Sequence, residues 1–258
     1  MTDARRALFA GLIDDAGLFP PASLPMAAAL ESHLAARAGD ERWILGRFLC
    51  PASRLDELGA ALPTDETLRL GIVLDTEELP ASTNGRIVVE TLEGRDPRAS
   101  FVEVPFDEHW ADGVRAAVAD VAERGTGGMK IRCGGLTAEA FPSPGQVAFF
   151  LAECHAAGVP FKATAGLHHP IRHVDAASNF THHGFLNLLA AAILAPGDAE
   201  AILADDDPGA FAVDADGLRW RDRHAGPAVI ERGRRFFVGY GSCSFADPVE
   251  DLRALGMI

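Results

Sequence analysis

The sequence predicts a single (β/α)8 barrel, the TIM-barrel architecture, with an irregular insertion between the seventh and eighth strands. Eight short apolar segments are rich in β-branched residues, as strands buried on both faces of a parallel sheet should be. Amphipathic helical patterns follow several of them, and 258 residues is close to the roughly 250 typical of one such barrel. No G-x-G-x-x-G motif follows the first segment, which removes the main support for a dinucleotide-binding sheet. We therefore predict one domain over residues 1–258.

The eight predicted strands alternate with helical stretches along the chain. They span residues 9–14, 44–50, 68–75, 86–91, 101–105, 128–133, 160–165 and 236–241. Between the fourth and fifth strands the connection is too short for a helix. The series otherwise favours a barrel over a doubly wound sheet.

Three helices have clear boundaries in the sequence. Residues 24–38 carry apolar side chains at helical spacing, and the glycine at 39 ends the pattern. Ser143 is the expected N-cap of the next helix, with Pro144 at its first position, Gln146 completing a capping box and Gly158 ending it. The last helix is expected to begin at the Asp-Pro pair at 247–248, with acidic residues in its first turn.

The insertion spans residues 166–235. We expect a helix at 185–195, an acidic surface run at Asp205, Asp206 and Asp207, a hairpin about Asp216 and Gly217, and a further helix. No internal repeat or low-complexity linker interrupts the chain. The insertion is therefore predicted as part of the barrel domain.

Composition excludes several classes of partner. With 23 Lys plus Arg against 37 Asp plus Glu, the formal net charge is -14, which argues against nucleic acid and anionic membranes as partners. A local basic pocket remains compatible with a small anion. The apolar run near the N-terminus is too short for a signal peptide, no segment approaches the ~20 apolar residues of a membrane span, and the four cysteines lack paired spacing. These features predict a cytoplasmic protein.

Lysine is the rarest charged residue of the chain. The basic residues are 21 arginines, a usage typical of a GC-rich genome, and two lysines, Lys130 and Lys162. Strand alternation turns Lys130 and Arg132 toward the barrel interior, and likewise Lys162 and Thr164. The lysines are 32 residues apart, one strand–helix unit, so we expect them on adjacent strands, each lowering the pKa of the other with the help of Arg132. A neutral amine is a nucleophile toward carbonyls and a base for carbon acids.

Other charges also interrupt the apolar segments. Single charges lie within strands at Arg47, Glu90 and Glu103, and aspartates end strands at Asp14 and Asp75. Buried unpaired charges are costly, so these groups either pair with one another or line a polar pocket. An internal ion-pair network without chemistry and a catalytic site at the C-terminal strand ends are both open.

Two short motifs resemble those of deoxyribose-phosphate aldolases. The segment from Lys162 to Gly166 resembles the K-x-[ST]-x-G strand that carries the Schiff-base lysine of that family. The segment from Lys130 through Gly134 and Gly135 resembles the family's K-x-x-G-G motif, whose lysine perturbs the first. In that family the Schiff-base motif comes first along the chain, whereas here it comes second. The resemblance implies that Lys162 forms the imine and Lys130 assists, and the inverted order leaves this assignment open.

Five of the nine histidines follow the Lys162 strand directly. They are His168, His169, His173, His182 and His183. Imidazoles at this position can act as general acids or bases near neutral pH, or bind zinc or another divalent metal. Their spacing matches no standard zinc motif, and a solvated loop is the simpler interpretation. Asn187 could orient a ligand, although we expect that it does not.

The eighth strand ends in glycine and serine. Gly241 faces inward in the alternation and Ser242 precedes a helix, an arrangement often used by barrels to bind phosphate. A tight turn that requires glycine explains the same residues. For the cysteines at 133 and 243, no feature of the sequence lowers the thiol pKa.

The leading hypothesis is a lyase of the aldolase type that uses lysine amine chemistry on a small carbonyl compound, anionic or phosphorylated, without a required cofactor. Its catalytic residues would be Lys162, Lys130, His168, His169 and Glu103. Substrate binding would fall to Arg132, Thr164, Asp14, Asp75, Glu90, Arg47, Gly241 and Ser242. One alternative is a hydrolase or isomerase that depends on a divalent metal, zinc for example, held by the histidines with Asp14 or Asp15. The other is a non-catalytic binder of small molecules, and a homo-oligomer is compatible with all three.

Overall fold

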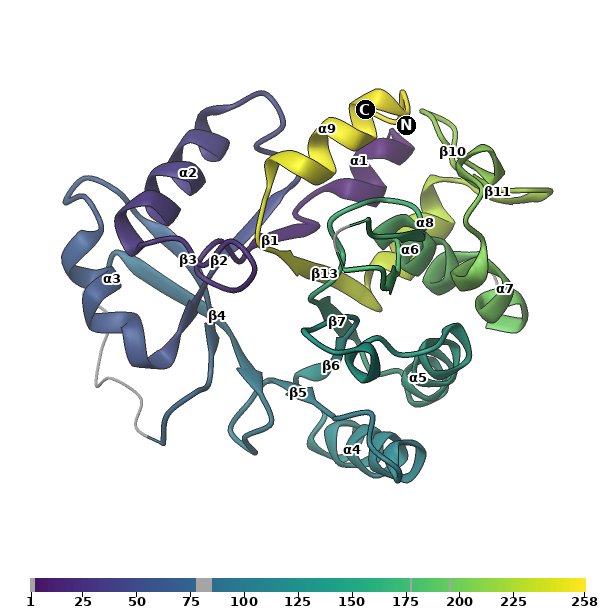
Figure 1. Ribbon diagram of the computed structural model, residues 1–258, viewed down its shortest axis with the longest axis horizontal. Coiled ribbons are helices and arrows are strands. Elements are labelled where there is room, and N and C mark those ends of the chain that lie inside the picture. The colour runs from purple at the N-terminus through teal and green to yellow at the C-terminus, as the bar shows by residue number, and fades with distance from the viewer. Residues whose placement is uncertain (1–2, 78–84, 177, 195) are drawn as a thin grey trace.

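Eight parallel strands form a closed barrel in the computed structural model, which describes residues 3–77, 85–176, 178–194 and 196–258. Around the barrel the order is β1-β13-β7-β6-β5-β4-β3-β2 (Figure 1). The strands are β1 (Ile13–Asp15), β2 (Leu45–Pro51), β3 (Leu68–Val73), β4 (Ile87–Gly94), β5 (Phe101–Glu103), β6 (Gly128–Arg132), β7 (Phe161–Thr164) and β13 (Phe237–Ser242). The predicted (β/α)8 barrel is confirmed, and each predicted strand overlaps one of these eight.

Most strand boundaries differ from the prediction by one or two residues, and two differ by more. The first strand begins at Ile13, because residues 4–9 form the helix α1 (Ala4–Phe9), whose first turn is capped by the Asp3 carboxylate. The fourth strand continues to Gly94, three residues beyond its predicted end. A register shift against β3, where Leu70 pairs with Val89 but Gly71 pairs with Thr91, places a bulge inside it.

Helices cover the barrel unevenly. They are α2 (Met26–Ala38), α3 (Leu55–Ala61), α4 (Trp110–Arg124), α5 (Pro144–Ala157), α6 (Phe185–Ile193), α7 (Ala199–Ala204), α8 (Pro227–Arg234) and α9 (Ala246–Ala254). Short 3-10 helices lie at Ala52–Arg54, Ala138–Ala140, Pro196–Asp198 and Pro208–Ala210. Within the described residues no helix follows β3 or β4, so the ring of helices around the barrel is incomplete there (Figure 1). For β4 the sequence predicted this absence.

The expected caps of α5 are present. Ser143 Oγ accepts from the Gln146 backbone N–H at 3.2 Å, and Gln146 Oε1 accepts from the Ser143 N–H at 2.8 Å. Gly158 ends the helix in the left-handed conformation, with a φ of 68°. The final helix begins at Ala246, one residue before its predicted start.

The insertion contains two small antiparallel sheets besides α6, α7 and α8. A two-stranded sheet joins β8 (His173–Val174) to β9 (Thr181–His182), and a three-stranded sheet has the order β10-β11-β12. The latter strands are β10 (Phe211–Val213), β11 (Leu218–Trp220) and β12 (Arg223–Ala225). The predicted hairpin connects β10 and β11, and the predicted helix at 185–195 is α6, with residue 195 outside the described residues.

The predicted acidic surface run is wrong at its first member. Asp205 is buried, and its carboxylate accepts hydrogen bonds from the Trp220 indole at 2.8 Å and from Arg221 at 2.9 Å. A carboxylate satisfied in this way can be buried at low cost. Asp205 therefore joins α7 to the three-stranded sheet instead of lying in solvent.

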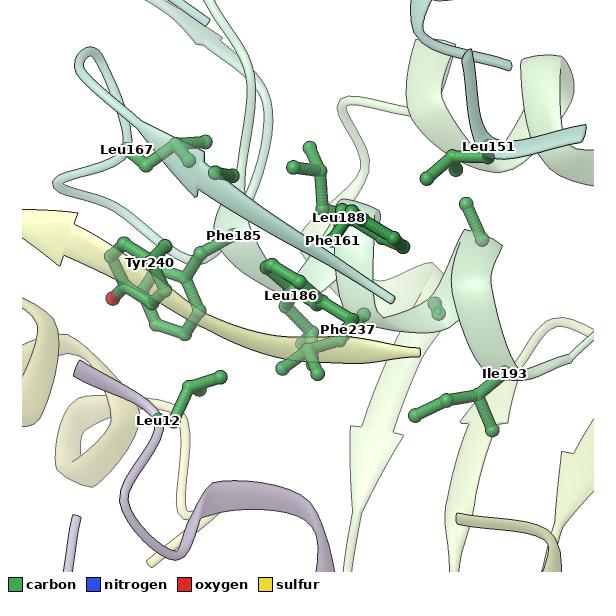
Figure 2. Packing of buried hydrophobic residues seen from close by; sticks show 14 of the residues in the cluster. Leu12, Leu151, Phe161, Leu167, Phe185, Leu186, Leu188, Ile193, Phe237 and Tyr240 are labelled. Atoms are coloured by element: carbon green, nitrogen blue, oxygen red, sulfur yellow. The ribbon is translucent and has the colours of Figure 1, made fainter. Parts of the chain in front are cut away.

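The largest core lies between the barrel wall and the helices outside it. Phe161 on β7 stacks on Phe237 of β13 with ring centroids 4.9 Å apart, and Phe185 of α6 stacks on Tyr240 at 5.1 Å (Figure 2). Phe161 and Tyr240 alternate along their strands with the inward-facing residues, and a register shift between Phe237 and Gly239 lets Phe237 face the same core. The core therefore fixes which side chains of β7 and β13 enter the barrel.

None of the helices in the described part of the chain is long and apolar enough to cross a membrane.

Candidate active site inside the barrel

Lys130 and Lys162 lie side by side in the barrel interior. They are register partners on β6 and β7, as their spacing predicted. Their outward-facing neighbours Met129, Ile131 and Ala163 belong to the core, so both lysines point inward. Both side chains are almost completely buried, with 3% and 1% of their surface exposed.

The carboxylate of Glu93 lies between the two amines. Its Oε2 is 3.0 Å from Lys130 Nζ, and its Oε1 accepts a short hydrogen bond from Lys162 Nζ. Thr91, also inward on β4, donates to Oε1 at 3.0 Å. The sequence hypothesis did not include Glu93, because it ended the fourth strand at Thr91. Extending the strand past Thr91 would have shown Glu93 as a further charge within it.

Two further carboxylates extend the cluster at either side. Asp14 on β1 is fully buried, and its Oδ2 is 2.5 Å from Lys162 Nζ. Glu103 at the end of β5 has Oε2 3.9 Å from Lys130 Nζ and Oε1 3.1 Å from Arg132 Nε. Arg132 ends β6, and 46% of its side chain is exposed. The cluster thus joins the buried centre of the barrel to solvent at the C-terminal strand ends.

Charges of alternating sign run through the whole barrel. In order from its N-terminal to its C-terminal end the groups are Arg69, Glu90, Arg47, Asp14, Lys162, Glu93, Lys130, Glu103 and Arg132, each within 3.9 Å of the next. Five cations and four anions leave one positive charge along this line. Opposite charges at each step lower the cost of burying the central members.

The electrostatics of Lys162 differ from the expectation. Burial alone would lower its pKa, but Asp14 and Glu93 outweigh burial and raise the pKa above its usual value. Burial alone would likewise raise the pKa of Glu93, yet Lys162 and Lys130 lower it to about 2. The expected lowering of the Lys162 pKa by its lysine neighbour is therefore wrong, because a carboxylate separates the two amines. Lys162 is a fixed cation.

Glu90 and Arg47 lie below the lysine cluster, toward the N-terminal end of the barrel. Glu90 is at the bulge of β4, where it forms a bidentate pair with Arg69 at 2.6 and 3.0 Å. Arg47 Nε is 2.9 Å from Glu90, and its Nη1 is 3.5 Å from Asp14. The bulge thus separates Glu90 from the lysines, while Arg47 contacts them only through Asp14.

Asp75 lies outside the cluster and holds a loop. Its two oxygens accept from the backbone N–H and the hydroxyl of Ser53 at 2.9 and 2.6 Å. Ser53 belongs to the short helix that follows β2. The carboxylate therefore ties the end of β3 to the connection between β2 and α3.

The end of β13 is more closely packed than expected. A Cβ added at Gly241 would lie 3.0 Å from Leu49 and 3.4 Å from Thr164 Oγ1. The absence of a side chain at Gly241 therefore lets Leu49 and Thr164 pack closely against β13. Thr164 is the register partner of both Gly241 and Arg132. The Ser242 hydroxyl is buried and donates a hydrogen bond to the Ser244 carbonyl at 2.6 Å. This hydrogen bond lies within the turn that follows β13.

The glycines that follow the two lysine strands are needed for close packing of the loops. A Cβ at Gly134 would lie 2.9 Å from Gly166 Cα, and one at Gly166 would lie 2.9 Å from the Cys133 carbonyl oxygen. Gly166 also has a φ of +69°, in the left-handed region. The glycines of the two motifs therefore bring the β6 and β7 loops into backbone contact.

The histidines have different polar partners, although the rings of His169, His173 and His182 pack against one another in series. His168 lies with its Nε2 3.7 Å from Cys243 Sγ, whereas exposed His169 pairs with Asp251 at 2.5 Å. His173 and His182 face each other across β8 and β9. Within the described residues, no group of three or more His, Cys, Asp or Glu side chains is arranged to hold a metal ion.

His183 and Asn187 serve the fold. His183 is buried and hydrogen-bonds the Pro142 carbonyl through Nε2 at 2.6 Å. Asn187 on α6 donates to the carbonyls of Ile202 and Asp205, and accepts from the Arg172 N–H. As expected, Asn187 is committed to the protein itself.

No family model matches this sequence, and no curated protein matches it either.

Proposed function

We propose that the protein is an enzyme of the aldolase type, in which a lysine amine in the barrel forms an imine with a small anionic carbonyl compound. The fold is one commonly used by enzymes, with the site at the C-terminal strand ends. The observation that carries the proposal is the shared carboxylate of Glu93, which contacts the only two lysines of a chain that otherwise uses arginine. What distinguishes lysine chemically is an amine that can lose its proton.

Lys130 is the better placed nucleophile of the two. Lys162 is held as a cation by Asp14 and Glu93, whereas Lys130 has a single close partner in Glu93 and a longer contact of 3.9 Å to Glu103. Lys130 is also two contacts from the half-exposed Arg132, so a compound that enters from the C-terminal end meets it first. This assignment reverses the roles that the motif resemblance implied.

The surrounding charges match the proposed reaction. The Lys130 nitrogen attacks the carbonyl carbon, water leaves, and the resulting iminium withdraws electrons from the bond that breaks. Lys162 keeps a positive charge beside this centre, and Glu93 and Glu103 are within reach of protons on Lys130. Arg132 can pair with an anionic group of the substrate while its Glu103 contact holds it at the strand end.

Reductive trapping tests the proposal directly. The chain is incubated with acetaldehyde, pyruvate, dihydroxyacetone phosphate and glyceraldehyde 3-phosphate, each with borohydride, followed by intact mass and peptide mapping. Because the sequence has two lysines, an adduct maps to one of two peptides. We expect an adduct on Lys130 with at least one anionic compound, and none there in Lys130→Arg, which retains a positive charge but cannot form the imine.

Three other results have distinct meanings. An adduct on Lys162 would restore the assignment implied by the motifs. Trapping in the wild type no greater than in a Lys130→Arg, Lys162→Arg double variant would overturn the proposal and leave an ion-pair network that serves the fold. Equal trapping of neutral and anionic compounds would remove the role given to Arg132.

A further inference from the structure

A cavity of about 320 Å³ lies at the N-terminal end of the barrel, opposite the proposed active site. It opens between α2 and the first residues of β2, β3 and β4, with Gly46, Leu68 and Val88 in its wall. Small-molecule sites begin at roughly this size. The two lysines lie inside the barrel on other strands, β6 and β7, so the two sites are separate.

Arginines give this cavity a positive lining. Arg37, Arg42 and Arg69 line it together with His33, and no acidic residue is among its lining residues. The chain has a formal charge of -14, so three arginines around one cavity form a local excess of positive charge. Guanidinium groups bind phosphate and carboxylate oxygens through paired N–H donors.

The neighbouring carboxylates neutralise these arginines only in part. Arg37 is 3.2 Å from Glu66, and Arg69 pairs with Glu90, which also serves Arg47. Arg42 donates to a backbone carbonyl and has no carboxylate partner within the described ranges. The cavity therefore keeps at least one uncompensated positive charge.

The cavity wall adjoins the charges that lead to Lys162. A Cβ at Gly46 would lie 2.2 Å from Asp14 Oδ1. The Gly46 backbone therefore lies directly between the cavity and the Asp14 carboxylate. The next backbone N–H, of Arg47, donates to the same oxygen at 2.7 Å, while the other oxygen of Asp14 holds Lys162. An occupant of the cavity would thus lie next to Gly46, whose other side contacts a carboxylate that binds Lys162.

We propose that this cavity binds a small oxyanion, a phosphate or carboxylate group, through Arg37, Arg42 and Arg69. This site does not depend on the lysine chemistry, since it needs only the charge and shape of the N-terminal end. Its position against Gly46 places it next to the charge network of the barrel and apart from the place where a substrate would react.

Anion titration of the intact chain tests the site. Inorganic phosphate, succinate and chloride are compared at constant ionic strength by calorimetry and by the shift in unfolding temperature. We expect saturable binding of phosphate or succinate, whichever group the site prefers, and none of chloride. Arg42→Gln should bind about fivefold more weakly or worse, as for loss of one partly exposed charge contact. Arg37→Gln should act in the same direction.

Two further variants make the result specific. Glu66→Gln removes the carboxylate that competes for Arg37, so it should bind the anion more tightly than the wild type. Arg115→Gln is the matched control for Arg37→Gln, because both are partly exposed helical arginines paired with carboxylates, and Arg115 lies on α4, away from the cavity. Absence of saturable binding, or an equal loss of affinity in Arg115→Gln and Arg37→Gln, would overturn the proposal.

Discussion

Lys130 and Lys162 are register partners on neighbouring parallel strands, and the carboxylate between their amines comes from a third strand. Two like charges at adjacent inward positions would repel each other strongly in a buried site. Glu93 offsets this repulsion, since each of its two carboxylate oxygens forms an ion pair with one of the amines. The stability of the barrel centre therefore depends on this one side chain.

Loss of the Glu93 charge should destabilise the protein strongly. Glu93→Gln keeps the shape of the side chain but leaves two buried amines with less compensation, and removing one partner of a buried ion pair costs about 3–5 kcal/mol. Urea denaturation at pH 7 measures the change in the free energy of unfolding. Glu57→Gln, at an exposed carboxylate paired with Arg54, is the control and should leave that free energy unchanged within error. Equal stability of the two variants would contradict the role given to Glu93.

The contribution of the Glu93 carboxylate to the free energy of unfolding should be lost at low pH. Its pKa is about 2 in the folded protein against an ordinary 4.5, so the unfolded chain binds the extra proton first as pH falls. The stabilisation is therefore fully present above about pH 4.5 and is lost as the pH approaches 2. The difference in unfolding free energy between the wild type and Glu93→Gln should shrink across this window. A difference that stays constant from pH 7 to pH 2.5 would show that Glu93 titrates normally.

His183 should remain neutral in mildly acidic solution. Burial lowers its pKa to about 4, with a further contribution from nearby Arg172, although the Pro142 carbonyl opposes the shift. Because an unfolded histidine has a pKa of about 6.5, this residue stabilises the fold less and less as pH falls from about 6.5 toward 4. A pH titration of the imidazole resonances by NMR should give a midpoint near 4 for His183. A midpoint at the ordinary value would mean that the ring is solvated.

The two left-handed glycines Gly166 and Gly125 should respond differently to alanine. Both have positive φ, +69° and +65°, so each substitution carries a backbone strain of about 1–2 kcal/mol. A Cβ at Gly125 meets nothing within 4 Å, whereas one at Gly166 meets the Cys133 carbonyl oxygen at 2.9 Å. Gly166→Ala should therefore lose more free energy of unfolding than Gly125→Ala, measured in urea. Equal losses would mean that the β6 and β7 loops can separate without cost.

Much of the architecture could be predicted from local patterns. Strand alternation, the capping box at Ser143 and the glycine at 158 are properties of neighbouring residues, and they predicted the eight barrel strands, α5 and the inward direction of Lys130 and Lys162. Asp14 and Glu103 were expected either to pair with other buried charges or to line a polar pocket, but no local pattern placed them beside the lysines. Glu90 was expected at the same site, yet it lies apart from the lysines, because a bulge in β4 breaks the alternation that places residues on one face.

The sequence by itself determined that the two lysines enter the barrel side by side, because period-two alternation and the scarcity of lysine are visible without coordinates. Only the tertiary structure decided which charged side chains of the barrel interior form ion pairs with one another. Glu93 and Lys162 are 69 residues apart, and Asp14 and Lys162 are 148 apart, so no local pattern could pair them. Barrel closure brings β1 beside β13 and so completes the ring of strands around these side chains. That closure turned two lysines expected to repel each other into members of a chain of alternating charges.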